Sequence, residues 1–332
     1  MNEAPFAAAD RGLILGATGF VGKTLVPALA RKQVKLRVLA RDKAKVSAFF
    51  PAYRDIEVVE GDVLTGDGLD EALRGIHTAF YLIHSLGGKS LFKNTEFAGQ
   101  DRTAAANFIG AADNAGLKRV IYLGGLGEEG AGLSEHLSSR TEVGKILASR
   151  RPCATILRAA VIIGAGGASF EMLRHLVERL PVMVCPNWIE TRIQPIALQD
   201  VIAYLVGCLF NAGTCGQTFD IGGPDIMTYR EMMQEYAAAR GLRRRLIVVV
   251  PLLTPLLSAY WVDLVTPVPS GIAHPLIEGM RNEVICRDTR IDGYVPIRKT
   301  GFKEAVRAAV SAGNGSGRTK PVDHSAEVKN GR

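Results

Sequence analysis

The sequence predicts an α/β protein with a doubly wound parallel sheet and a smaller C-terminal lobe. In the first half of the chain, short apolar runs alternate with segments of helical periodicity, which is typical of strands joined by crossover helices. A glycine-rich turn follows the first apolar run directly. After about residue 165 the alternation gives way to shorter and less regular segments, which indicates a separate lobe.

Six apolar runs in the first half predict six strands, and a turn signal or a helical pattern follows each of them. The predicted strands cover residues 12–15, 36–40, 56–60, 78–84, 119–123 and 154–163. The helices predicted between them cover residues 21–30, 95–115 and 139–149.

The second half has fewer regular elements. Thr228 and Glu231 have the spacing of a capping box, so a helix should begin there and continue to about residue 240. The other predicted elements are helices at 170–179, 198–210 and 302–312, an irregular stretch at 181–193 and a short strand at 218–221.

These elements predict three parts of the chain. Residues 1–225 form the dinucleotide-binding domain, and residues 165–195 could belong either to it or to the second lobe. Residues 226–312 form the C-terminal lobe, where we expect the substrate to bind. Residues 313–332 are polar and almost free of large apolar side chains, so we expect a disordered tail.

Composition excludes several classes of protein. The net charge of +7 is spread along the chain without interleaved aromatic residues or zinc-ligand spacing, so we expect neither nucleic-acid binding nor a metal site. The N-terminal residues lack an apolar signal core, which favours the cytoplasm. Five cysteines occur without a CxxC motif, and we expect reduced thiols: Cys153, Cys185, Cys208, Cys215 and Cys286.

The glycine-rich turn predicts a dinucleotide site. Gly16 permits the tight turn, Gly19 lets the backbone approach a pyrophosphate, and Gly22 permits close packing of the following helix. Thr18, Phe20 and Val21 complete the turn, and the helix N-terminus behind it favours an anion. Because a strand precedes the turn and a helix follows it, the context supports this interpretation.

Residues at later strand ends complete the expected cofactor site. Arg41 stands at the end of the second strand, where NAD-selective folds place a carboxylate, so we expect NADP(H), with NAD as the alternative that the neighbouring Asp42 leaves open. Asp62 and Val63 follow the third strand, where a carboxylate could bind adenine or form an ordinary turn. His84 and Ser85 follow the fourth strand and could line the nicotinamide ribose.

The turn GATGFVG, the GDV after the third strand and Lys145 after the fifth resemble the short-chain dehydrogenase/reductase superfamily, which has a Rossmann fold. The glycine spacing resembles its extended and atypical branches, among NmrA-like and complex-I-accessory-subunit-like NAD(P)-binding proteins. Over about residues 12–287, the chain resembles bacterial members labelled nucleoside-diphosphate-sugar epimerases or NAD(P)H-binding proteins, through YLIHSL, YLGGLGEEG, HLSSRTEVGKIL, QPIALQDV and FDIGGPDIMTYREMM.

The chain also departs from the catalytic residues of the superfamily that it resembles. Active reductases of the superfamily use a Ser-Tyr-Lys set with the tyrosine four residues before the lysine. Thr141 occupies the tyrosine position, and Gly124 and Gly125 occupy the serine position. Only Lys145 remains as a candidate catalytic and ribose-binding residue.

Three functions are compatible with these residues. The first is an NADP(H)-dependent atypical reductase of a small hydrophobic or carbonyl substrate. The second is a non-catalytic NADP(H)-binding module that acts as a redox sensor or as a regulatory or assembly partner. The third, sugar-nucleotide epimerisation, depends on the missing tyrosine.

Residues 246–268 form an apolar, proline-broken stretch after Arg243, Arg244 and Arg245. It is too short and too interrupted for a transmembrane helix. Peripheral contact with an anionic membrane is one interpretation. Because the stretch is apolar on every side, we instead favour a buried segment that covers the substrate pocket, with Tyr260 or Trp261 near the substrate.

Overall fold

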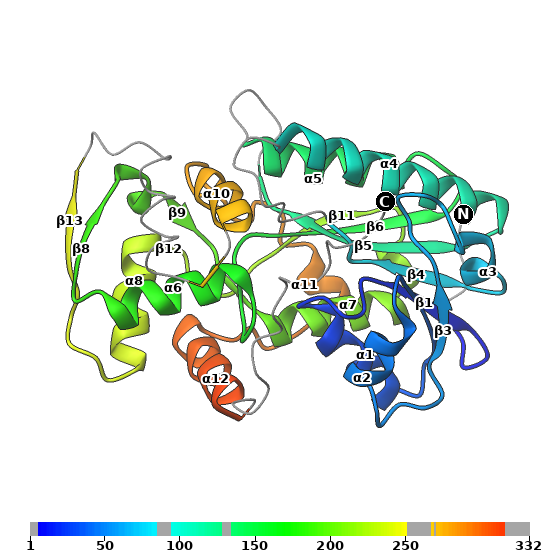
Figure 1. Ribbon diagram of the computed structural model, residues 1–332, viewed down its shortest axis with the longest axis horizontal. Coiled ribbons are helices and arrows are strands. Elements are labelled where there is room, and N and C mark those ends of the chain that lie inside the picture. Colours follow the sequence, from blue (N-terminus) through cyan, green and yellow to red (C-terminus); the bar gives the residue numbers. More distant parts are fainter. Residues whose placement is uncertain (1–5, 85–93, 128–133, 251–266, 269, 316–332) are drawn as a thin grey trace, which may run out of the picture.

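The computed structural model describes residues 6–84, 94–127, 134–250, 267–268 and 270–315. At its centre is a seven-stranded sheet with the order β11-β6-β5-β4-β1-β2-β3, in which neighbouring strands are parallel (Figure 1). The predicted doubly wound parallel sheet is therefore confirmed. Its strands are β1 (Arg11–Leu15), β2 (Lys35–Ala40), β3 (Glu57–Glu60), β4 (Thr78–Tyr81), β5 (Arg119–Gly125), β6 (Cys153–Ala159) and β11 (Thr218–Ile221).

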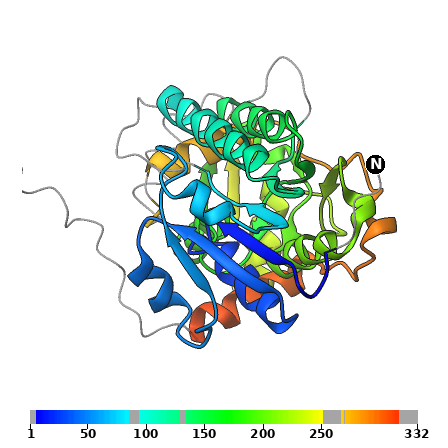
Figure 2. The same ribbon diagram turned by 90° about the vertical axis from the view of Figure 1, so that its right-hand side faces the viewer.

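Helices cover both faces of this sheet, as Figures 1 and 2 show. One face carries α3 (Leu69–Leu73), α4 (Asn94–Asn114) and α5 (Glu135–Leu147). The other face carries α1 (Gly22–Arg31), α2 (Lys43–Phe49), α7 (Leu198–Phe210) and α11 (Ile291–Tyr294). Because both faces are covered, Leu13, Ile14 and Leu15 of β1 are fully buried, which explains the continuous apolar run in the sequence.

The second lobe has its own hydrophobic core, to which Phe170, Tyr236 and Val306 contribute. Its helices are α6 (Ala168–Arg179), α8 (Tyr229–Ala239), α10 (Ser270–Gly279), α12 (Phe302–Gly315) and the 3₁₀ helix η1 (Asn187–Glu190). Its short strands are β8 (Val182–Cys185), β9 (Arg192–Ile193), β12 (Met227–Thr228) and β13 (Leu246–Val249), which pair as β8–β13 and β9–β12. The segment that joins β6 to α7 therefore contributes to both halves of the molecule.

Several predicted boundaries are corrected by the structure. The predicted strand 78–84 ends at Tyr81, and the predicted strand 154–163 divides into β6 and β7 (Ile162–Ile163), which pairs with β10 (Ile196–Ala197). The stretch expected to be irregular, 181–193, contains β8, η1 and β9. The last helix, α12, continues three residues beyond its predicted end at residue 312. The capping box is confirmed, since Thr228 Oγ1 accepts from Glu231 N at 3.1 Å.

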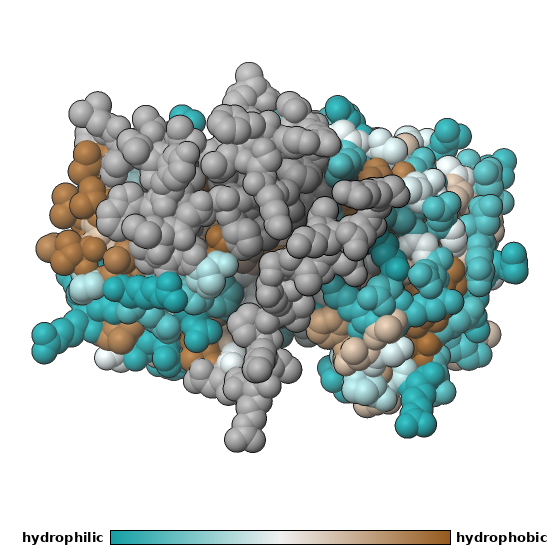
Figure 3. All heavy atoms as spheres, viewed as in Figure 1, coloured by the Kyte–Doolittle hydropathy of each residue, from teal (hydrophilic) through white to brown (hydrophobic). Residues whose placement is uncertain are grey.

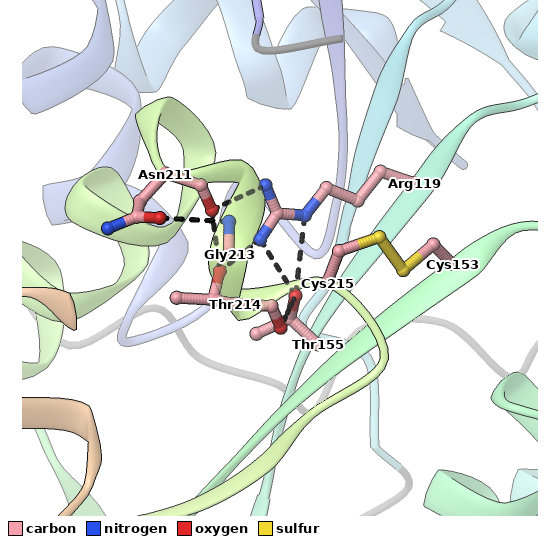
Figure 4. Close-up of a disulfide and its surroundings, with 7 residues drawn as sticks. All are labelled: Arg119, Cys153, Thr155, Asn211, Gly213, Thr214 and Cys215. Atoms are coloured by element: carbon pink, nitrogen blue, oxygen red, sulfur yellow. Dashed lines mark hydrogen bonds between the residues drawn. A yellow bond between two sulfur atoms is a disulfide. The ribbon is translucent and has the colours of Figure 1, made fainter. Parts of the chain in front are cut away.

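The prediction of reduced thiols is wrong for two of the five cysteines. Cys153, at the start of β6, forms a disulfide with Cys215, and their Cα atoms are 5.7 Å apart (Figure 4). Beside it the buried guanidinium of Arg119 donates to Thr155 Oγ1 at 2.8 Å and to the carbonyl oxygen of Asn211 at 3.2 Å. The parallel pairing of β6 with β11 brings these segments together across 62 residues, which cysteine spacing could not indicate.

Candidate functional site

A cavity of about 670 Å³ opens at the carboxyl edge of the sheet, beside the turn that follows β1. In doubly wound sheets, ligands bind where the strand order reverses, which here is between β1 and β4. The walls come from the glycine turn, the ends of β4, β5 and β6, the helix α5 and the second lobe. The lining residues are Gly16, Gly19, Phe20, Val21, Gly22, Leu82, His84, Leu123, Gly124, Gly125, Leu126, His136, Leu137, Arg140, Ala159, Ala160, Ile162, Gly166, Gly167, Ala168, Ser169, Ile193, Leu276, Gly279, Met280 and Val284.

The glycine turn has the backbone geometry that a pyrophosphate site needs. Gly16 has a φ of +89°, which side-chain-bearing residues rarely adopt. A Cβ atom on Gly22 would collide with the carbonyl oxygens of Gly16 and Ala17, the second at 2.6 Å, so this glycine closes the turn itself. The helix α1 begins without a side-chain cap and without an acidic residue in its first turn. Its N-terminus therefore fits an anionic phosphate.

Phe20 connects this turn to the second lobe. Its ring lies against Gly167 and Gly164, where added Cβ atoms would approach the ring at 2.7 Å and 3.1 Å. Thr18 belongs to the same turn but is not among the described residues that line the cavity. The turn thus holds one wall of the cavity against the other.

Positive charge gathers beyond the end of β2. Arg41 is exposed, and the neighbouring Asp42 caps α2 because its Oδ1 accepts from Lys45 N at 2.9 Å. Burial and the nearby ammonium group of Lys45 lower the pKa of Lys23. Lys23 directly follows Gly22 of the glycine turn, and the carboxylate of Asp42 is engaged with its own helix.

Asp62 and Val63 lie at the carboxyl end of β3, outside the cavity lining. Asp62 Oδ1 accepts from Leu64 N at 2.9 Å, which is a turn interaction. Val63 is buried, and its carbonyl oxygen accepts from Asn107 Nδ2 at 3.2 Å. Their part in adenine binding stays a prediction.

The other predicted site residues are divided between the cavity and the surface. His84 lines the cavity, whereas Lys145 is exposed on α5 and is not among the described lining residues. Ser85, Tyr260 and Trp261 lie outside the described residues. The structure therefore brings His84 into the same cavity wall as the glycine turn, and the role of Lys145 stays a prediction.

Two cavity residues were missed in the sequence, His136 and Arg140 of α5. They are four positions apart, the same spacing as the tyrosine and lysine of the superfamily's catalytic set. The superfamily's own positions on this helix are Thr141 and Lys145, so no family motif marks His136 and Arg140, and a four-residue spacing is common to any two residues on one helix face. The Thr141 hydroxyl, by contrast, donates to the Leu137 carbonyl oxygen at 3.1 Å within the helix.

Arg140 dominates the electrostatics of this wall. Its Nε is buried and has no hydrogen-bond partner among the residues that the structure describes. Its backbone carbonyl oxygen accepts from the Tyr122 hydroxyl at 3.1 Å, which anchors α5 to β5. Burial, together with the charge of Arg140, lowers the pKa of His136 to about 3, and the same causes lower the pKa of His84 well below its usual range. Both imidazoles are therefore neutral beside a cation at pH 7.

The chain is similar to known NAD(P)H-binding proteins. A family model described as NAD(P)H-binding matches residues 16–162. The ceramide reductase of Caulobacter vibrioides is 30% identical over 238 residues, which cover 70% of this chain and 72% of that protein. The mitochondrial NADH dehydrogenase [ubiquinone] 1 alpha subcomplex subunit 9 of Arabidopsis thaliana is 25% identical over 223 residues. That match covers 67% of this chain but only 56% of the subunit, little more than half its length.

The fold is also shared with solved structures. The triphenylmethane reductase of Citrobacter sp., solved with NADP(H), superposes with a TM-score of 0.69 at 20% identity and covers 90% of this chain and 99% of that one. The glycine turn, the strand order and the 30% identical relative lead to the same conclusion. This chain belongs to the NAD(P)H-binding, Rossmann-fold proteins of the atypical short-chain dehydrogenase/reductase family.

Proposed function

We propose that this protein is an NADP(H)-dependent reductase of a hydrophobic carbonyl compound, with Arg140 in place of the usual tyrosine as the group that stabilises the reacting oxygen. The observation that carries this proposal is the cavity itself. It extends from the glycine turn to a buried guanidinium nitrogen without a partner among the described side chains. A cofactor site and an anion-stabilising group thus share one cavity.

The chain's own residues fit the cofactor. Gly16, Gly19 and Gly22 with the N-terminus of α1 would hold the pyrophosphate, and Arg41 would hold the 2′-phosphate. The capping role of Asp42 supports NADP over NAD, because this carboxylate is already engaged beside Arg41. When bound, NADPH supplies the hydride that reduces the carbonyl carbon, and it becomes NADP⁺.

Arg140 then acts on the carbonyl oxygen. As hydride reaches the carbon, negative charge develops on the oxygen, and a fixed cation in a partly dry site stabilises that charge. The neutral ring of His136 can donate a hydrogen bond to the same oxygen. The alkoxide takes its proton from water that enters the open cavity, so that the product is an alcohol.

The remaining walls favour an apolar substrate. Aliphatic side chains from both lobes face the cavity, among them Leu126, Leu276 and Met280. A long alkyl chain would gain roughly 0.8 kcal/mol for each CH₂ group buried there. The name of the 30% identical ceramide reductase, which refers to a lipid, supports the same substrate class.

Steady-state kinetics of NADPH oxidation test this function. The substrates are aldehydes and ketones with alkyl tails of increasing length, and the proteins are the wild type, Arg140→Met and Arg140→Lys. We expect Arg140→Met to lower kcat by about 10²–10³-fold, as loss of an oxyanion-stabilising donor does. We expect Arg140→Lys to retain part of the activity and NADPH affinity to change little.

Two further variants show whether a loss of activity is specific to Arg140. Lys145→Met tests the alternative cation, and Arg102→Gln, which removes an exposed partner of Glu142, is the matched control. A loss in Lys145→Met with none in Arg140→Met would contradict the role of Arg140. NADPH binding without turnover of any substrate would instead favour the non-catalytic binding module.

A further inference from the structure

The strands β8 and β13 expose an apolar surface at one end of the second lobe. Four side chains project from it, with exposed fractions of 53% for Val182, 60% for Val184, 60% for Leu246 and 45% for Val248. The parallel register places Leu246 beside Val182 and Val248 beside Val184, so the four form one continuous group. We call these four residues the strand patch. Figure 3 shows the hydrophobic atoms gathered at this end of the molecule, over β8 and β13.

The patch rests on a well-packed support. The alternate residues of the same strands, Met183, Cys185 and Ile247, are buried in the lobe core. Side chains alternate between the two faces of a strand, so packing against the lobe core explains why one face of this ribbon is apolar but not why the other is. The expectation that the stretch from Leu246 is buried on every side is therefore wrong for its described strand, and the strand patch is not part of the cavity lining.

Positive charge adjoins the patch. Arg243 and Arg244, directly before β13, are exposed, and no described carboxylate pairs with either of them. Arg245 turns inward, where its Nε donates to the Val177 carbonyl oxygen at 2.8 Å and fixes the start of the strand. The segments 179–187 and 240–250 contain no aspartate or glutamate.

We propose that the strand patch, with Arg243 and Arg244, binds the surface of an anionic lipid bilayer. The four aliphatic side chains would enter the interfacial region, and the two guanidinium groups would contact lipid phosphates. A second copy of the chain suits this surface less well, because a two-fold contact through the patch would bring like charges together. No helix among the described residues is long and apolar enough to cross a membrane.

Vesicle flotation of the full chain tests the proposal. The vesicles are pure phosphatidylcholine or a mixture of phosphatidylcholine with anionic phosphatidylserine, and each kind is tested at low and at high salt. One variant carries Val182→Thr, Val184→Thr and Val248→Thr, which keep β-branched side chains in the strands. The other carries Arg243→Gln and Arg244→Gln. The matched controls are Ile226→Thr, at a site 51% exposed, and the exposed pair Arg31→Gln with Lys32→Gln.

We expect the wild type to float with anionic vesicles at low salt, and much less with neutral vesicles or at high salt. The Arg243/Arg244 variant should bind about 30-fold more weakly, and the threonine variant should also lose binding. Both controls should bind as the wild type does, and all variants should still bind NADPH. Absence of flotation, equal loss in the controls, or a wild-type dimer that the threonine variant dissociates would each overturn the proposal.

Discussion

Arg140 and Lys145 stand five positions apart on α5, yet only Arg140 faces the cavity. Five residues rotate a helix by about 140° relative to the starting side chain, so the two cations point away from each other. The sequence could predict the helix and its cations, but not which of its faces turns toward the sheet edge. The role of Lys145 therefore stays a prediction, while the position of Arg140 is an observation.

Cofactor choice is also decided at the residue scale. Arg41 and Asp42 are both exposed at the end of β2, but the Asp42 carboxylate accepts a capping bond from α2, and Arg41 makes no such contact with this fully described helix. We expect NADPH to bind more tightly than NADH, and Arg41→Ala to weaken NADPH binding by about 1.5 kcal/mol, the lower end for a charged hydrogen bond. Isothermal titration calorimetry with both cofactors measures this. Equal wild-type affinities, or an equal loss for NADH in the variant, would remove the assignment of NADP.

At the scale of elements, local signals predicted the strands of the central sheet and failed for the pair β8 and β13. The strands β1 to β5 and the helix α7 were predicted within a few residues, because each is a strong apolar or periodic run. The strands β8 and β13 have four residues each and become strands only through pairing across about 60 residues. No local pattern contains that partner. The Cys153–Cys215 disulfide could not be predicted for the same reason, because only the pairing of β6 with β11 brings the two cysteines together.

The disulfide between Cys153 and Cys215 should stabilise the folded protein. It closes a loop with a sequence separation of 62, and the chain-entropy relation for such a loop predicts a stabilisation of about 4 kcal/mol. Denaturant unfolding of the wild type and of Cys153→Ser with Cys215→Ser measures the difference. Dithiothreitol should lower the wild-type midpoint toward that of the variant and leave the variant unchanged. A wild-type midpoint that does not respond to reductant would contradict a stabilising bond.

At the scale of the whole molecule, the cavity exists because the second lobe closes over the edge of the sheet. Phe20 of the glycine turn packs on Gly164 and Gly167, and α10 supplies Leu276 and Gly279 to the opposite wall. The sheet order, the glycine turn and a second lobe could all be predicted from the sequence. The contact between the two halves could not, because it depends on segments that cross from one half to the other.

Transfer of deuterium from NADPH to the product tests whether this protein is a carbonyl reductase that uses Arg140. NADPH deuterated at the transferable C4 position is incubated with a long-chain ketone, and the alcohol product is analysed by mass spectrometry. We predict one deuterium on the carbinol carbon with the wild type, and about 10²–10³-fold slower label transfer with Arg140→Met at saturating NADPH. Saturated cofactor binding with no labelled alcohol from any carbonyl tested would contradict the reductase activity, and equal label transfer by wild type and Arg140→Met would contradict the role of Arg140.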